Sequence, residues 1–412
     1  MKSRYCNEVK NPSRVGKNDI EKYLKNEIEF LLAPSAEQLL EVSWDDIYIN
    51  IPELENDLKS YLEYSRSDRT LFFTGVTGSG KSMVIKNVFK IRNMTPRIDG
   101  KCLIIPFAFD NLQNEIKDFF ANMILCACDL IEENSPVKLA SIYETEFYNS
   151  IKNARGDNSQ RGKKWPRNKK PQTISERIRV YSEESPISFS SSLLKFYLNQ
   201  PESGINNVLF IVDDIEGIGE EKELLPIKTI YEVLTCMENS PKTRKWSSKV
   251  IISCRNYVYR IVSTRNMNDY AEFVKMSNQT LESYEPTNHI SLKTDIKLLD
   301  IIQKRYYAIV KENSDDKWKL AMEIVRIMLT EIDNSIGDLI LNLNIGNFRK
   351  SLNTLKKIVF NKTWIQRDYK SATIGAFCID DIHKFDIKPV NLIRALTMEN
   401  NIVYNSMNSI IP

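Results

Sequence analysis

A glycine-rich segment that joins an apolar run to a helix restricts the possible folds of this chain. Residues 75–82 read Gly-Val-Thr-Gly-Ser-Gly-Lys-Ser and fit the pattern G-x-x-x-x-G-K-[ST]. The apolar run Thr70–Gly75 precedes the segment, and a helix is expected from about Lys81 to Lys90. Only 13 of the 412 residues are glycine, so a chance match is rare. The segment predicts a strand, a phosphate-binding loop and a helix in that order.

The residues of this loop have separate roles in phosphate binding. The glycines allow backbone N–H groups to turn toward phosphate oxygens, and the helix N-terminus adds a partial positive charge. Lys81 is expected to reach the β- and γ-phosphates, and the Ser82 hydroxyl to ligate Mg²⁺. We therefore predict ATP and Mg²⁺ as cofactors. The residues predicted to bind the nucleotide are Gly75, Val76, Thr77, Gly78, Ser79, Gly80, Lys81, Ser82 and Met83.

Two adjacent carboxylates follow a second apolar run, which begins at Val208 and ends at Asp213 and Asp214. ATP hydrolysis needs one acid to hold Mg²⁺ and its bound water and another to polarise the attacking water. We assign Asp213 to the metal and Asp214 to the general base, with Glu216 as a reserve candidate for the base. The alternative interpretation is a strand that ends in solvated acids.

Polar residues also end the next apolar run, Lys249–Ser253. A polar side chain here is expected between the phosphate-binding loop and the acidic strand, where it senses the γ-phosphate. Arg255 and Asn256 are the first candidates, and Ser253 is the third. The alternative is an ordinary turn at the end of a strand.

The order of apolar runs and helical stretches predicts an α/β fold. Apolar strands that alternate with helices imply a parallel sheet covered by helices on both faces. From Asp295 to about Phe360 the periodicity is helical, which predicts a small bundle after the sheet. Gly346–Arg349 opens a helix in this bundle and places Arg349 where a lid closes on the nucleotide, although such an arginine is often only solvated. The expected strands are 70–75, 102–109, 206–213, 249–253 and 289–292.

Together these motifs resemble the P-loop NTPases of the AAA+ and STAND classes, in the branch of initiator-like ATPases and ATPases of bacterial defence or mobile elements. The resemblance covers roughly residues 45–362 and implies a cytoplasmic ATPase that binds ATP and ADP and works as an oligomer or with an effector protein. Arg255 matches the sensor-one position and Arg349 the sensor-two arginine. The domains it implies are an arm and helix (1–44), a P-loop ATPase domain (45–293), a helical lid (294–362) and a partial winged-helix-like segment (363–412).

The sequence departs from the AAA+ pattern at three places. The second acid is Asp214, where AAA+ proteins usually have glutamate, and this favours the STAND or KAP side and slow turnover. No arginine finger acting in trans is evident, and Arg260 and Arg265 are candidates by position only. The tail resembles the start of a winged helix but is too short to complete one.

An insertion at about 134–187 carries a strongly basic core, Arg161–Lys170. Residues 151–180 contain ten Lys or Arg and two acids. Such cations neutralise phosphates and Trp165 can stack on a base, so nucleic acid is a candidate partner. The alternative is a solvated loop, because runs of charged residues are usually solvated loops.

Composition excludes some classes of protein. The chain is 42% hydrophobic and 27% charged, which excludes a wholly disordered protein, and its net charge of +3 excludes a general polycation. No apolar run approaches the ~20 residues of a membrane helix, so we expect a cytoplasmic protein without membrane contact. Seven scattered cysteines indicate reduced thiols, and with two histidines they argue against a zinc site.

Three functions fit these features. The first is an ATP-driven switch that closes a lid, self-associates and engages a partner or DNA. The second is a P-loop kinase, which is less favoured because its lid is expected within the sheet domain. The third is a non-catalytic scaffold in which Asp214 holds geometry without turnover.

Overall fold

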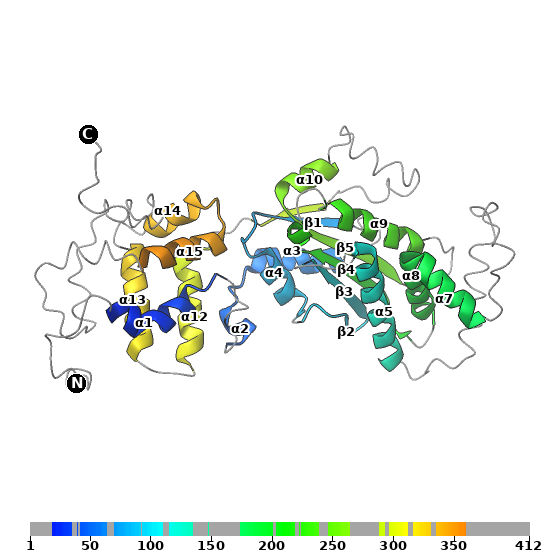
Figure 1. Ribbon diagram of the computed structural model, residues 1–412, viewed down its shortest axis with the longest axis horizontal. Coiled ribbons are helices and arrows are strands. Elements are labelled where there is room, and N and C mark those ends of the chain that lie inside the picture. The colour runs from blue at the N-terminus through cyan, green and yellow to red at the C-terminus, as the bar shows by residue number, and fades with distance from the viewer. Residues whose placement is uncertain are drawn as a thin grey trace, which may run out of the picture. The chain divides into compact units, whose positions relative to one another are not determined.

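The computed structural model (Figure 1) describes most of residues 19–359. Nothing is described for 1–18 and 360–412. The gaps between these ends are 35–38, 40–41, 64–69, 92, 110–114, 135–146, 148–173, 201–202, 219–221, 223, 239–245, 264–287, 293–295, 312–315 and 331–334.

The chain divides into two compact units. The sheet unit comprises Pro52–Gly75 and Lys81–Lys293, and the helical unit comprises Met1–Ile51, Val76–Gly80 and Thr294–Pro412. Each unit has a hydrophobic core of its own. Within the glycine-rich segment 75–82, Val76–Gly80 is assigned to the helical unit, and Gly75, Lys81 and Ser82 are assigned to the sheet unit.

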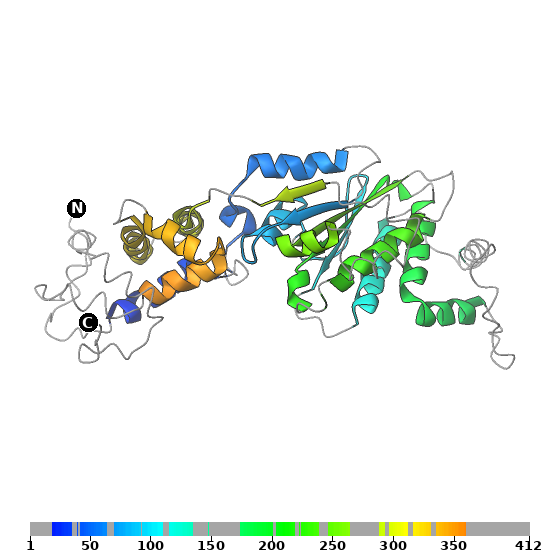
Figure 2. The same ribbon diagram turned by 90° about the horizontal axis from the view of Figure 1, so that it is seen from above.

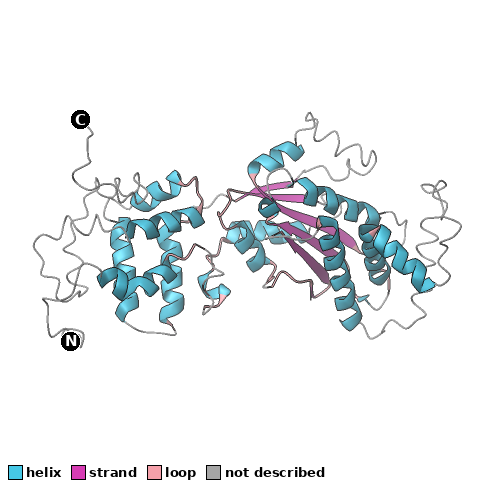
Figure 3. Ribbon diagram, in the orientation of Figure 1, coloured by secondary structure: helices cyan, strands magenta, loops and turns pink. Residues whose placement is uncertain are grey.

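The sheet unit is an α/β fold built on six strands (magenta in Figure 3) in the order β2-β3-β4-β5-β1-β6. Strand β2 pairs with β3 in the antiparallel sense, and every other pair is parallel. The strands are β1 (Thr70–Thr74), β2 (Arg97–Asp99), β3 (Cys102–Ala108), β4 (Asn207–Asp213), β5 (Ser247–Cys254) and β6 (Asn288–Ser291). The expected parallel sheet is confirmed.

Helices surround this sheet. They are α3 (Pro52–Glu63), α4 (Lys81–Val88), α5 (Ile116–Asn134), α7 (Ile174–Glu184), α8 (Pro186–Leu198), α9 (Leu224–Glu238) and α10 (Asn256–Ser263), with the 3₁₀ turn η5 (Ile215–Ile218). Figure 2 shows α3 on one side of the sheet and the green helices on the other. Helix α3 is tied to β5 because the Tyr61 hydroxyl donates to the Val250 carbonyl at 3.1 Å and the Lys249 ammonium donates to the Leu62 carbonyl at 3.2 Å.

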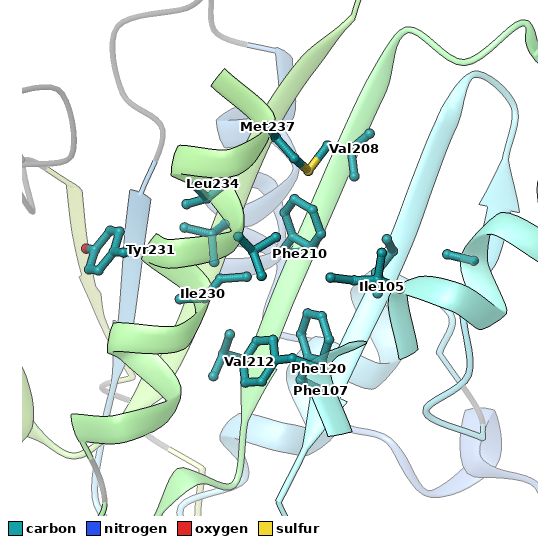
Figure 4. Close-up of a cluster of buried hydrophobic side chains, with 14 of the residues drawn as sticks. Ile105, Phe107, Phe120, Val208, Phe210, Val212, Ile230, Tyr231, Leu234 and Met237 are labelled. Carbon is teal, nitrogen blue, oxygen red and sulfur yellow. The ribbon is translucent and has the colours of Figure 1, made fainter. Parts of the chain in front are cut away.

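The core on one face of the sheet packs α5 and α9 against the central strands (Figure 4). Side chains alternate between the faces along each strand, so Phe107, Phe210 and Val212 lie on this face and are fully buried. The alternate set is buried as well, which shows that the opposite face is covered. Its members are Leu71, Phe73, Ile104, Leu209, Ile211 and Ile251. Burial on both faces explains the nearly unbroken apolar runs of these strands.

Part of the predicted insertion is helical. Helix α7 lies at 174–184, and Tyr181 on it meets Phe189 of α8 edge to face, with ring centroids 5.7 Å apart. Phe147 also contacts Phe189, at 5.9 Å between centroids. An aromatic cluster therefore anchors the ends of this insertion, whereas its basic core, Arg161–Lys170, lies outside the described residues.

The helical unit contains α1 (Asp19–Leu31), α2 (Trp44–Ile47), α12 (Leu298–Val310), α13 (Asp316–Thr330), α14 (Ser335–Leu343) and α15 (Phe348–Val359). The apolar stripe of α13, with Met322, Val325 and Leu329, is buried as its spacing predicts. Helix α1 joins the same core through Leu24, Ile28, Leu31 and Leu32. The N-terminal helix is therefore a structural part of the bundle.

Buried Arg305 on α12 holds the end of α1. Its Nη1 donates to the carbonyl oxygen of Leu31, the last residue of α1, at 2.9 Å and to that of Ala33 at 2.7 Å. Carbonyl groups at a helix C-terminus lack intrahelical partners and need other donors. Burial lowers the pKa of the Arg305 guanidinium to about 10, so it stays charged at neutral pH. The Arg305 guanidinium therefore makes the hydrogen bonds that water would make to these carbonyl groups if they were exposed.

We expect Arg305→Ala to destabilise the helical unit by about 2–4 kcal/mol, because two buried carbonyls lose their charged donor and a cavity opens. The change is measured as the shift of the urea denaturation midpoint. Lys311→Ala is the control, because its ion pair with Asp46 is solvent-exposed and should contribute less than about 1 kcal/mol. Equal shifts for the two variants would contradict the role given to Arg305.

Candidate nucleotide site

Three neighbouring strands carry the predicted site residues to one edge of the sheet. Strand β5 lies between β1 and β4, and all three are parallel, so their carboxyl ends meet. The Gly75 N–H donates to the Cys254 carbonyl at 3.3 Å and so continues the β1–β5 pairing beyond the strand. The loop start, the acids and the polar residues after β5 therefore come together, as the sequence predicts.

Lys81 begins α4 and its side chain is buried. Its ammonium donates to the Gly75 carbonyl at 3.2 Å and to Glu216 Oε1 at 3.3 Å. The loop thus folds back on the lysine that follows it. This cation is held at the strand edge and faces a carboxylate 135 residues later in the sequence.

Ser82 and Asp214 form a direct contact between the loop and the acidic strand. The Ser82 hydroxyl donates to Asp214 Oδ1 at 3.2 Å. Asp214 has a φ of 55°, a left-handed conformation that non-glycine residues seldom adopt. The backbone turns sharply just after β4, and this turn aims the Asp214 side chain at Ser82.

Asp213 ends β4 with only 1% of its surface exposed. Both of its carboxylate oxygens are buried and find no hydrogen-bond partner among the described residues. Burying a carboxylate in this way is costly unless a cation or a donor compensates it. The position therefore fits a residue that receives a cation.

Ser253 lies beside Asp213. Val212 pairs with Ile252, so Asp213 and Ser253 are the next residues on the two adjacent strands and lie on the same face of the sheet. The Ser253 hydroxyl is buried and finds no hydrogen-bond partner among the described residues. Ser253 was the third candidate from sequence, and its burial beside Asp213 favours it as a polar group of the site.

Arg255 follows β5 and reaches the same carboxylate as Lys81. Its Nε lies 3.6 Å from Glu216 Oε1, and its guanidinium lies over the Tyr257 ring at 5.8 Å from the centroid. Asn256 begins α10 and is exposed. Of the two first sensor candidates, only Arg255 is placed against another predicted site residue by these contacts.

A histidine that the sequence analysis did not assign contacts the end of β1. His289 Nε2 lies 2.6 Å from the Thr74 hydroxyl, and its ring stacks on Tyr259 of α10 at 4.1 Å between centroids. Desolvation lowers the pKa of His289, which favours its neutral form. The apolar pattern of β6 gave no signal for this contact, because it depends on β6 pairing with β1.

The central loop residues and the Gly346–Arg349 segment contact each other within the helical unit. The Phe348 N–H donates to the Gly78 carbonyl at 3.1 Å, and the Asn347 side chain is packed against the Gly78 α-carbon. Gly78 and Gly80 have φ values of 73° and 99°, so the glycines are required by backbone conformation. Arg349 directly follows Phe348 in the sequence and is exposed.

The two loop glycines provide a test of this contact. Gly78→Ala and Gly80→Ala should each lower the free energy of unfolding by about 1–2 kcal/mol, because alanine is strained in the left-handed conformation. An added Cβ at Gly78 would also overlap Asn347 and lie 3.2 Å from the Arg349 Cβ, whereas nothing lies within 4 Å at Gly80.

We therefore expect Gly78→Ala to lower the denaturation midpoint more than Gly80→Ala, by an additional ~1–3 kcal/mol of overpacking. Asn347→Ala should recover part of that additional loss. Identical midpoints for the two glycine variants would show that Asn347 does not pack on the loop.

Several predicted features are exposed or lie outside the described part of the chain. Arg260 is exposed near the end of α10, whereas Arg265, Arg161–Lys170 and the C-terminal segment 363–412 are not described. No helix of the described chain combines the length and apolar character needed to cross a membrane.

The described residues contain no group of three or more His, Cys, Asp or Glu side chains suited to a metal ion. A Mg²⁺ site needs no such group, because this ion keeps several waters and takes only one or two protein carboxylates. The Ser82 hydroxyl together with Asp213 or Asp214 provides donors of this kind, all of them oxygen atoms. The residues present therefore fit Mg²⁺.

No protein-family model matches the sequence, and no curated protein matches it significantly.

Proposed function

We propose that this chain is a Mg-ATP-binding ATPase of the P-loop class. One observation carries the proposal: the loop residue Ser82 and the strand-end residue Asp214, 132 positions apart, meet at 3.2 Å. Buried Lys81 directly precedes Ser82, and the buried carboxylate of Asp213, which directly precedes Asp214, finds no hydrogen-bond partner among the residues that the structure describes. A phosphate-binding lysine, a hydroxyl and two carboxylates at one edge of a parallel sheet are the groups that nucleotide hydrolysis requires.

Each residue has a distinct task in this proposal. Lys81 binds the β- and γ-phosphates with its ammonium, and the glycine-rich loop orients the phosphate chain with its N–H groups. Ser82 and Asp213 hold Mg²⁺, which when bound neutralises charge on the phosphate oxygens. Asp214 accepts a proton from the attacking water, and Ser253 or Arg255 contacts the γ-phosphate from β5. Val76, Thr77, Ser79 and Met83 complete the nucleotide contacts of the loop.

The resemblance to AAA+ and STAND ATPases supports a finer proposal. ATP binding would bring Arg349 onto the γ-phosphate, favour self-association and expose a surface for a partner protein or DNA, and hydrolysis would reset the protein. A role in bacterial anti-phage defence or in a DNA transaction follows from the same resemblance.

The competing functions make different predictions. A scaffold without turnover would bind ATP and release no phosphate, whereas a kinase would transfer the phosphoryl group only to an added acceptor. The Asp213 carboxylate finds no hydrogen-bond partner in the described part of the chain, which favours a site for Mg²⁺, and all three functions share such a site. The choice between them therefore depends on steady-state phosphate release.

The experiment measures nucleotide binding by titration with ADP and a non-hydrolysable ATP analogue, followed by phosphate release with ATP and Mg²⁺, with and without DNA. We expect Mg²⁺-dependent binding and slow turnover, which chelation of Mg²⁺ abolishes. Binding without phosphate release would favour the scaffold. No binding of either nucleotide would contradict the proposed function.

A further inference from the structure

One carboxylate at the site is shared by two cations from different elements. Glu216 Oε1 lies 3.3 Å from Lys81 Nζ and 3.6 Å from Arg255 Nε. The Glu216 side chain is 13% exposed, and the side chains of Lys81 and Arg255 are 7% and 29% exposed. The lysine begins α4 and the arginine directly follows β5, so the carboxylate bridges two separate parts of the site.

The fold holds Glu216 in this position. It lies on η5, which directly follows Asp213 and Asp214 at the end of β4. The neighbouring Ile215 is fully buried and belongs to the core of the sheet unit. The short turn thus fixes the carboxylate opposite Lys81.

Two cations that converge on one oxygen atom form a site for an anion. A phosphate oxygen has the same charge and the same need for N–H donors as a carboxylate oxygen. If Lys81 binds phosphate, its ammonium must leave Glu216 or share itself between the two anions. The carboxylate and the phosphate therefore compete for the same donor.

We propose that Glu216 is an internal competitor of the nucleotide: its carboxylate occupies the position of a phosphate oxygen between Lys81 and Arg255, and the polyphosphate displaces it on binding. This inference rests on the proposed function and deepens it. Glu216 is then a positioning residue that sets nucleotide affinity, in place of the reserve general base that the sequence suggested. Its release on binding also frees Arg255 to contact phosphate.

The test compares Glu216→Gln with the wild-type chain by calorimetric titration of ATP and, separately, of inorganic pyrophosphate. Glu216→Gln keeps the shape of the side chain and removes the competing charge. We expect it to bind both ligands about tenfold more tightly, a change of the size of one charge-assisted hydrogen bond. The matched control is Glu232→Gln, which makes the same change of net charge on α9, where Glu232 pairs with Lys117. This control should bind both ligands as the wild type does.

The outcomes separate this inference from the proposed function. If the wild type binds ATP and Glu216→Gln binds it equally or more weakly, the inference is overturned and the ATP-binding function stands. If neither protein binds ATP, the proposed function is overturned, and the pyrophosphate titration alone decides the role of Glu216.

A measurement of thermal stability tests the inference even if Glu216→Gln folds poorly. Glu216→Gln leaves two cations facing each other, so pyrophosphate should raise its melting temperature by more than that of the wild type. An equal or smaller rise, or failure of saturating pyrophosphate to restore the fold, would overturn the inference.

Discussion

Replacing Lys81 with alanine is expected to remove measurable ATP binding, with an affinity loss of at least about a hundredfold. Lys81 is the cation at the start of α4, and its buried ammonium is held between the Gly75 carbonyl and Glu216. A charged hydrogen bond to phosphate in a buried site is worth about 1.5–3 kcal/mol, and Lys81 is proposed to contact two phosphates. Titration with a non-hydrolysable ATP analogue in the presence of Mg²⁺ measures the loss.

The control for this substitution is Lys86→Ala, which removes the same charge from the same helix, one turn beyond the motif. It should bind the nucleotide with nearly unchanged affinity. Both proteins should give the circular dichroism spectrum of the wild type, because the loop and the sheet edge keep their other contacts. Unchanged affinity in Lys81→Ala would remove the phosphate-binding assignment of residues 75–82.

The parallel sheet was predictable because its strands are buried on both faces. Strand β4 is then a continuous apolar run that ends abruptly in acidic residues, and β5 has a shorter apolar run before Ser253. This pattern is visible without a structure. Strand β2 was missed, since Arg97–Asp99 is three residues long, has charged residues on both sides of Ile98 and lies at the edge of the sheet. Nothing in its composition distinguishes it from a loop.

Packing between segments that are distant in the chain could not be predicted from the sequence. A helix was expected within residues 1–44, but not that Ile28 and Leu31 would pack into the core formed by α12 and α13. The contacts of Arg305 were not predictable either, because they depend on where the carbonyl oxygens of Leu31 and Ala33 lie. An amphipathic pattern shows that one face of a helix packs against other residues, but it does not identify those residues.

In the candidate site, too, local sequence patterns were predictable and long-range contacts were not. The spacing of glycines, lysine and serine predicts a phosphate-binding loop because each residue type has a separate physical reason to be there. Glu216 was noted only as a spare acid, and its contacts with Lys81 and Arg255 depend on the turn η5. The roles of Asp213 and Asp214 remain predictions.

The two adjacent acids are expected to fail in different ways when each is changed to asparagine. Asp214→Asn should retain Mg-ATP binding and lose at least about a hundredfold in phosphate release, because general-base catalysis typically contributes 10²–10⁴-fold. Asp213→Asn should weaken the Mg²⁺-dependent part of binding as well, because it removes the charge assigned to the metal. Parallel titrations with and without Mg²⁺, followed by phosphate release, distinguish the two variants.

The burial of Asp213 adds a second readout that does not depend on activity. Its carboxylate is 1% exposed and finds no hydrogen-bond partner among the described residues, so its charge is unfavourable in the absence of a cation. Asp213→Asn should therefore leave the metal-free protein as stable as the wild type or more stable, and should abolish the rise in melting temperature that Mg-ATP produces. Asp214→Asn should keep that rise. Since Ser82 contacts Asp214, the opposite pattern would assign the metal to Asp214 and exchange the two roles.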